Sequence, residues 1–234
     1  MAITKQAVRY DVGGKAHESL AVWDDAVAGQ RPLVLVAPTF MGRSAFEEGK
    51  AERLAGLGYA AMAVDIYGVD RKPADFDEAG AAMQTLNGDR AGLAAMMQAA
   101  FDAARELEVA DASKIAAIGF CFGGKCVLDL ARQGADLKGV VTFHGIFDPP
   151  GIPMAETIPA KILALHGWDD PLAKPEAVIA FAAEMTGKKA DWQLHAYGDT
   201  EHGFTNPGRP QMYRADADRR SWQAMENFLD EVFG

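Results

Sequence analysis

The sequence predicts an α/β fold in one domain over residues 1–234, with a mostly parallel central sheet, helices on both faces and an antiparallel hairpin at the N-terminus. The main support is an alternation along the chain between short apolar runs of strand length and longer segments with apolar residues at helical spacing. Residues 33–37 add to this, because they are apolar throughout, as expected of a central strand that helices cover on both sides.

The N-terminal hairpin is predicted from alternation and a turn. Val8, Tyr10 and Val12 alternate with polar residues, the Gly13-Gly14 pair supplies a tight turn, and alternation resumes after it. Beyond residues 33–37, further strands are predicted at residues 60–64, 114–119, 140–143, 162–166 and 192–197.

The first helix is predicted from its caps. Ser44 and Glu47 have the spacing of a capping box, Leu54 and Leu57 continue the apolar face, and Gly58 can close the end in the left-handed conformation. Further helices are predicted at residues 93–107, 123–132, 175–185 and 222–233, and a polar loop at residues 70–77.

The charge balance limits the partners of the chain. It has 23 Lys plus Arg against 33 Asp plus Glu, a net charge of −10, which disfavours binding to nucleic acid or anionic lipid. No stretch approaches the roughly 18 consecutive apolar residues of a membrane span, and the first residues contain no apolar signal core. We therefore expect a cytoplasmic protein with a small-molecule partner, and we predict no oligomeric state.

The segment Gly119-Phe120-Cys121-Phe122-Gly123-Gly124 lies between a predicted strand and a predicted helix. It has the spacing of a nucleophile elbow, in which crowding requires small residues two before and two after the nucleophile. The N-terminus of the following helix would favour the reactive thiolate of Cys121. The alternative interpretation is a common glycine-rich turn that holds an inert, buried cysteine.

The other cysteine, Cys126, is predicted to pack in the core, and two cysteines provide no disulfide framework. A phosphate-binding loop is disfavoured, because Lys125 is not followed by a hydroxyl residue.

A nucleophile elbow requires an acid after a later strand and a histidine after the last one. Asp170 follows residues 162–166, and His202 follows residues 192–197. We prefer Asp170 to Asp169 because it has the Gly-x-x-Asp-Pro arrangement usual for this loop, which leaves its neighbour to cap the turn. Four other histidines are assigned differently: His17 and His195 to structure or surface, and His144 and His166 to the pocket lining or, more simply, to hydrogen-bonded structural positions.

These residues predict covalent catalysis. The Cys121 thiolate would attack a carbonyl carbon to form a thioester, His202 would move the proton, and Asp170 would orient the imidazole. The developing oxyanion would be bound by the backbone N–H groups of Phe122 and Phe40.

Several segments together resemble the dienelactone hydrolase family of the α/β-hydrolase fold over nearly the whole chain. They are the elbow with the preceding Ala116-Ala117-Ile118, residues 134–141 leading to Phe143-His144-Gly145, Asp191-Trp192-Gln193, and His202-Gly203-Phe204-Thr205-Asn206-Pro207. The resemblance implies hydrolysis of an ester or lactone by a triad that falls on Cys121, Asp170 and His202, without a metal or organic cofactor.

The chain departs from the family pattern at two positions. Members resembling the type enzyme carry a Glu where Thr39 stands and an Arg where Asn206 stands. Losing both together is physically coherent, because one buried charge without its partner would be costly. We therefore expect that the substrate need not be anionic. The expected substrate pocket comprises Thr39, Phe143, Trp168, Phe204 and Asn206, although its aromatic residues are equally compatible with a place in the core.

Two other functions remain compatible with the sequence. Cys121 could belong to a protein that senses oxidants or electrophiles, or the chain could be a catalytically silent binder of small molecules on the same fold. The natural substrate is left open.

Overall fold

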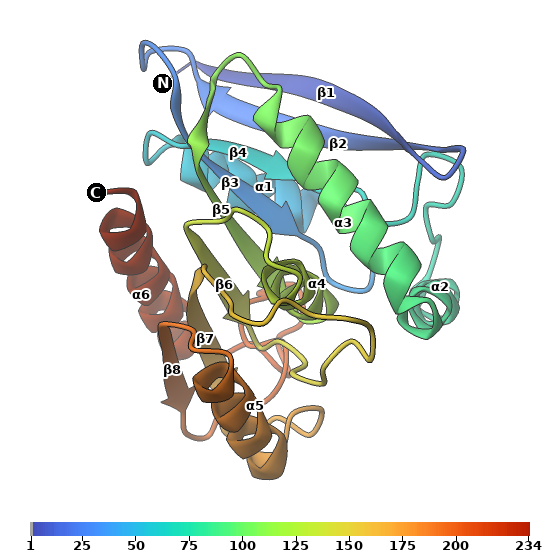
Figure 1. The fold of residues 1–234 in the computed structure, drawn as a ribbon, viewed down its shortest axis with the longest axis vertical. Helices are drawn as coiled ribbons and strands as arrows, with labels where there is room; N and C mark the ends of the chain where they lie inside the picture. The colour runs from blue at the N-terminus through green and yellow to red at the C-terminus, as the bar shows by residue number, and fades with distance from the viewer. Residues whose placement is uncertain (1) are drawn as a thin grey trace. The chain divides into compact units, whose positions relative to one another are not determined.

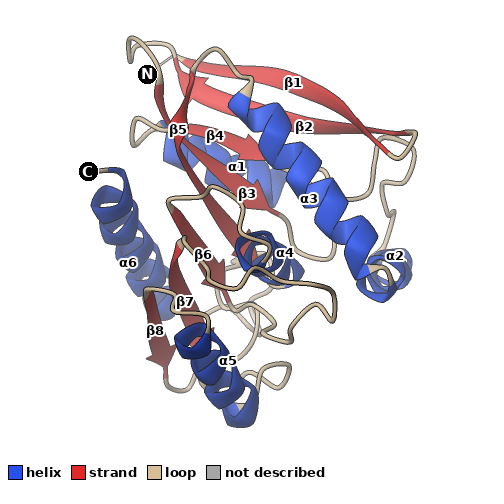
Figure 2. Cartoon of the chain, in the orientation of Figure 1, coloured by secondary structure: helices blue, strands red, loops and turns tan. Residues whose placement is uncertain are grey.

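The computed structural model describes residues 2–234. The chain forms two compact units, one ending at Ala117 and the other covering Ile118–Gly234, and strand β5 (Ala110–Phe120) contributes to both. The strands form an eight-stranded sheet with the order β1-β2-β4-β3-β5-β6-β7-β8 (Figure 2). This confirms the predicted fold class, whereas a single domain over the whole chain stays a prediction.

The first unit contains the predicted hairpin. Strands β1 (Ile3–Val12) and β2 (Lys15–Asp24) pair antiparallel, and Gly13 and Gly14 have φ of 58° and 80°, which glycine tolerates best. Strand β2 then pairs antiparallel with β4 (Ala60–Ala63), and β4 pairs parallel with β3 (Arg31–Ala37).

Three helices belong to the first unit, and α1 and α3 cover opposite faces of its strands (Figure 1). Their bounds are α1 Ala45–Ala55, α2 Phe76–Gly88 and α3 Arg90–Arg105. Helix α1 begins at the predicted capping box, but it ends before Leu57, which is 46% exposed and therefore does not continue the apolar face as predicted. Gly58 follows with φ of 94°. Helix α2 was not predicted, because it buries only one residue and its sequence has no clear apolar face.

The second unit has a parallel arrangement. Strands β6 (Gly139–Phe143) and β7 (Lys161–Gly167) are almost wholly buried and pair parallel, and β8 (Trp192–Tyr197) pairs parallel with β7. Helix α4 (Phe122–Arg132) packs on β6, and α6 (Ala215–Phe233), which starts earlier than predicted, lies on the opposite side of that strand (Figure 1). Helix α5 (Pro175–Gly187) follows β7.

The loop after β6 is attached to α4 by a buried cation. Arg132 donates to the carbonyl oxygens of Phe147 and Asp148 at 2.7 and 3.2 Å, and its charge is balanced by Asp129 and Glu184. This network holds the loop at the carboxyl end of the sheet, where ligands bind in such folds. None of the helices within residues 2–234 has the length and apolar composition needed to cross a bilayer.

Candidate active site

Cys121 lies on a strained turn between β5 and α4. Its φ of 56° and ψ of −115° are unfavourable for a residue with a side chain, and such strain is concentrated at functional sites. The turn is held by the Cys121 N–H, which donates to the Phe143 carbonyl at 3.0 Å. A side chain at Gly119 would collide with the backbone of Gly123, which explains the small residues around the elbow. The turn thus exposes part of the Cys121 side chain.

The N-terminus of α4 lies directly after the cysteine. The N–H groups of Gly124 and Lys125 donate to the Cys121 carbonyl, whereas the N–H of Phe122 makes no hydrogen bond within residues 2–234. An unoccupied N–H at a helix N-terminus is suited to bind negative charge. Phe122 can therefore serve as the first oxyanion donor.

Asp170 and His202 meet in the interior of the second unit. The distance from Asp170 Oδ2 to His202 Nδ1 is 2.7 Å, and the two residues are only 2% and 7% exposed. The other oxygen, Oδ1, accepts from the Leu172 N–H at 2.8 Å. The carboxylate thereby fixes the orientation of the imidazole. Within residues 2–234, the other ring nitrogen, Nε2, makes no hydrogen bond of ordinary geometry.

The charge of His202 depends on both partners. Burial lowers the pKa of this imidazole, but hydrogen bonds and charge interactions with Asp170 and Cys121 outweigh burial and raise the pKa to about 10. The Cys121 sulfur is therefore close enough to interact with the ring. At neutral pH the ring is protonated and can pair with a thiolate.

The neighbouring acid, Asp169, has a different role. Its Oδ2 accepts from the Thr200 N–H at 3.2 Å, and its own N–H donates to the Thr200 carbonyl at 3.0 Å. Asp169 thus connects the loops after β7 and β8, and Asp170 is the carboxylate that contacts His202.

His144 and His166 lie close to His202. His144 Nε2 lies 2.8 Å from Thr205 Oγ1, and its ring packs edge-on against that of His202 with centroids 5.1 Å apart. His166 is fully buried, and neither ring nitrogen has a hydrogen-bond partner within residues 2–234. Burial lowers the pKa of His166 and favours its neutral form, so it does not match the expectation of a hydrogen-bonded structural histidine.

The expected pocket residues of the second unit have different surroundings. Phe143 and Phe204 have no exposed surface, and their rings pack against Phe120 and His144, respectively. They therefore occupy core positions, the alternative left open by the sequence. Trp168 is 44% exposed at the carboxyl end of β7, where an aromatic side chain can contact a ligand. Asn206 is half-buried, and its Oδ1 accepts from the Gly208 N–H at 2.9 Å.

Thr39 and Phe40 belong to the first unit, in the turn after β3. The N–H groups of Thr39, Met41 and Gly42 all donate to groups within that unit. The Phe40 carbonyl accepts from the Tyr67 hydroxyl at 2.6 Å. The Phe40 N–H is thus left without a partner in residues 2–234, as an oxyanion donor requires.

Sequence reasoning identified Glu47 only as a helix cap. The structure shows it fully buried, with Oε1 accepting from the Thr39 N–H and Oε2 from the N–H and hydroxyl of Ser44. Burial raises the pKa of this carboxyl, although the hydrogen bonds oppose that effect. Glu47 therefore holds the turn in place. The signal in the sequence was the capping box, but burial was not deducible from it.

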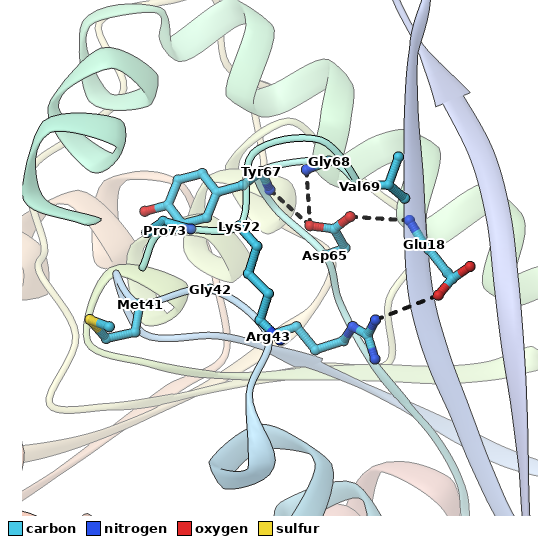
Figure 3. Close-up of a pocket in the computed structure, with 10 residues that line it drawn as sticks. All are labelled: Glu18, Met41, Gly42, Arg43, Asp65, Tyr67, Gly68, Val69, Lys72 and Pro73. Atoms are coloured by element: carbon cyan, nitrogen blue, oxygen red, sulfur yellow. Dashed lines mark hydrogen bonds and ion pairs between the residues drawn. The ribbon is translucent and has the colours of Figure 1, made fainter. Parts of the chain in front are cut away.

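A separate small pocket of about 140 Å³ lies in the first unit (Figure 3). Arg43 reaches Glu48 at 2.8 Å and Glu18 at 3.8 Å, and Asp65 accepts from the backbone N–H groups of Glu18, Tyr67 and Gly68. The charges of Arg43 and Asp65 are thus already engaged by groups of the first unit. Within residues 2–234, no group of three His, Cys, Asp or Glu side chains is arranged to hold a metal ion.

A strained turn that carries a cysteine between a strand and a helix, followed in chain order by an acid and a histidine on later loops, is the arrangement of an α/β-hydrolase. Residues 19–233 match the dienelactone hydrolase family. The chain belongs to that family, and the expectation of an ester or lactone hydrolase is confirmed.

The chain is also similar to individual known proteins. A promiscuous phosphotriesterase resembling dienelactone hydrolases, from metagenomic libraries, is 40% identical, superposes with a TM-score of 0.94 and is covered completely, as is this chain. An uncharacterized protein of Caenorhabditis elegans is 35% identical over 63% of this chain and 99% of its own length. A putative carboxymethylenebutenolidase of Escherichia coli is 27% identical over 88% of this chain and 79% of its own length.

Proposed function

We propose that the chain hydrolyses a small ester or lactone through Cys121, His202 and Asp170 by way of a thioester intermediate. The observation that carries this proposal is the 2.7 Å contact between Asp170 and His202, whose other ring nitrogen is left for the cysteine on the strained turn. The arrangement supplies the three groups that covalent hydrolysis needs: a nucleophile, a proton carrier beside it, and a carboxylate that orients the proton carrier.

Acylation begins with the thiolate–imidazolium pair. The sulfur of Cys121 bonds to the carbonyl carbon. The Phe122 N–H donates a hydrogen bond to the carbonyl oxygen and stabilises the negative charge that forms there. When the bond from carbon to the leaving oxygen breaks, His202 gives its proton to that oxygen. The alcohol leaves, and the acyl group remains as a thioester.

Deacylation uses the same histidine as a base. A thioester sulfur carries no charge, so the two contributions of Cys121 to the raised pKa of His202 vanish once the acyl group is attached. The neutral ring then takes a proton from water, and the hydroxide attacks the thioester carbonyl. Breaking the carbon–sulfur bond restores the thiolate beside a protonated His202.

The second oxyanion donor is proposed to be the Phe40 N–H. The hydrogen bond from the Tyr67 hydroxyl to the Phe40 carbonyl holds this peptide unit in place. Tyr67→Phe removes that hydrogen bond together with the longer one from the same hydroxyl to the Ala79 carbonyl at 3.5 Å, and is expected to lower kcat by up to about tenfold with little change in KM, given that a net hydrogen bond is worth about 1 kcal/mol. An unchanged kcat would remove Phe40 from the proposal.

The substrate class follows from two polar residues. Thr39 and Asn206 are uncharged, and the resemblance to the dienelactone hydrolase family implies a Glu and an Arg at these positions in its type enzyme. We propose that the substrate is uncharged and that Cys121 is activated by His202 and the α4 N-terminus without a further acid. Thr39→Glu should change turnover and the pH dependence of thiol alkylation, and no change in either would contradict this view.

A screen of neutral and anionic esters and lactones tests the proposal. We expect a burst of alcohol release and turnover with neutral substrates, both abolished in Cys121→Ala, while Cys126→Ala remains active. Fast oxidation of Cys121 without turnover would instead support a sensor, and ligand binding without either would support a silent binder.

Phosphotriesters are a second candidate substrate class, favoured by the phosphotriesterase that is 40% identical over the whole chain. In this reaction the Cys121 sulfur would bond to phosphorus and displace an aryloxide, leaving a phosphorylated cysteine that water must hydrolyse. Mass spectrometry of the enzyme after exposure to an aryl dialkyl phosphate should find the added dialkyl phosphoryl group on Cys121.

A further inference from the structure

His144 lies where three segments of the second unit meet: the nucleophile turn, β7 and the loop that carries His202. Its φ of 39° is in the left-handed region, which is unfavourable for a residue with a side chain and must be enforced by its surroundings. The Phe143 carbonyl accepts from the Cys121 N–H at 3.0 Å, and the His144 N–H donates to the Leu165 carbonyl on β7 at 2.8 Å. The backbone at His144 is therefore fixed between the nucleophile turn and β7.

The side chain of His144 contacts the third segment. Its Nε2 lies 2.8 Å from the Thr205 hydroxyl oxygen, and both residues are buried. The ring packs edge-on against the rings of His202 and Phe204, with centroids 5.1 and 5.2 Å apart, an arrangement in which rings attract each other. Because the ring is held at its backbone and at its far nitrogen, it presents a fixed surface to His202.

We propose that His144 is a positioning residue that keeps the His202 imidazole in its catalytic orientation during deacylation, an inference that rests on the proposed thioester mechanism. In the free protein two groups hold this imidazole, because Asp170 contacts Nδ1 and Cys121 interacts with the ring by hydrogen bonding and charge. The acyl group removes the charge of the sulfur and leaves Asp170 as the charged partner. A ring held by one hydrogen bond can tilt about it, and the edge-on contact with His144 opposes that tilt.

The contact should therefore affect the two halves of the reaction differently. In deacylation the oxygen of water bonds to the acyl carbon, its proton passes to His202 Nε2, and the electrons of the carbon–sulfur bond return to Cys121. This step depends on a neutral ring that faces neutral water, whereas acylation begins from an ion pair that aligns itself. Loss of the His144 ring should slow deacylation more than acylation, and a general loss of stability should slow both alike.

The test uses p-nitrophenyl acetate as the substrate and His144→Asn as the variant. Asn tolerates positive φ better than most residues, so the substitution keeps the turn and removes the ring. Stopped-flow release of p-nitrophenolate measures acylation, and steady-state release measures deacylation. We expect kcat and KM to fall together by about two- to tenfold, the rate equivalent of one ring contact, with kcat/KM and the burst rate unchanged. Acid quenching during turnover should trap more acetyl thioester on Cys121 than in the native chain.

Three further variants separate positioning from folding, and they test the proposal even if His144→Asn fails to fold. Thr205→Val removes the hydroxyl that anchors the His144 ring and should lower kcat and KM in the same way but by less, whereas Thr205→Ser keeps the hydroxyl and should recover most of that loss. Met185→Ala, on the buried face of α5, is the matched control. It should lower the urea midpoint of unfolding and leave the fraction of trapped thioester at its native value.

The outcomes distinguish this inference from the proposed function. A burst and turnover that survive Cys121→Ala would overturn the thioester mechanism, and the role of His144 with it. If turnover depends on Cys121, an unchanged fraction of trapped thioester in both His144→Asn and Thr205→Val would overturn the role of His144 alone. An equal rise of that fraction in Met185→Ala would do the same, because the effect would then reflect stability.

Discussion

Alkylation of Cys121 with iodoacetamide should lower the pKa of His202. The reagent turns the sulfur into a neutral thioether, which removes both the negative charge and the hydrogen bond that help to raise this pKa to about 10. The rise from 6.5 to about 10 corresponds to roughly 5 kcal/mol in favour of the protonated ring. A pair of unit charges about 4 Å apart at an effective dielectric of 20 is worth about 4 kcal/mol, or about three pKa units. The fall should therefore be at most about three units.

The assay is a pH titration of the imidazole nitrogens by NMR with labelled histidine. The His202→Gln variant assigns the signal of His202. The matched control is alkylated Cys126→Ala, which keeps Cys121 available to the reagent and so separates the effect of alkylating Cys121 from any effect of alkylating Cys126. In the free protein the ring should stay protonated from neutral pH up to about pH 10, and in the alkylated protein it should lose its proton at lower pH. An unchanged pKa after complete alkylation would refute the thiolate–imidazolium pair and the proposed change of His202 from acid to base.

Other variants test individual contacts. Asp170→Asn should lower kcat by about 10⁴-fold in ester hydrolysis because the ring loses its orienting carboxylate, whereas Asp169→Asn should stay within a few-fold of the native rate. Gly124→Ala should lower the free energy of unfolding in urea by about 1–3 kcal/mol, because its added methyl collides with β6, while Gly80→Ala in α2 meets open space and should be neutral or stabilising. Glu47→Gln should cost about 1–3 kcal/mol in the same assay although it removes a buried charge, since the amide NH₂ would face donors; a stabilised variant would refute this.

Much of the fold is encoded in local patterns. The alternation at residues 8–12 and 20–22, the apolar run at 33–37 and the capping box at Ser44 predicted β1, β2, β3 and the start of α1, because each depends on neighbours within a few residues. Helix α2 has no such pattern, since it buries almost nothing, and Leu57 was misplaced because the helix ends two residues before it.

For the candidate site, the sequence by itself determined the chain order of nucleophile, acid and histidine and the loops that carry them, because these follow from spacing along the chain. Only the tertiary structure decided which of the adjacent acids contacts His202, that Phe143 and Phe204 are buried, and that the ring of His144 packs against His202. The physical reason is that burial, hydrogen-bond partners and strand neighbours arise from segments far apart in the sequence, whose approach no local pattern specifies.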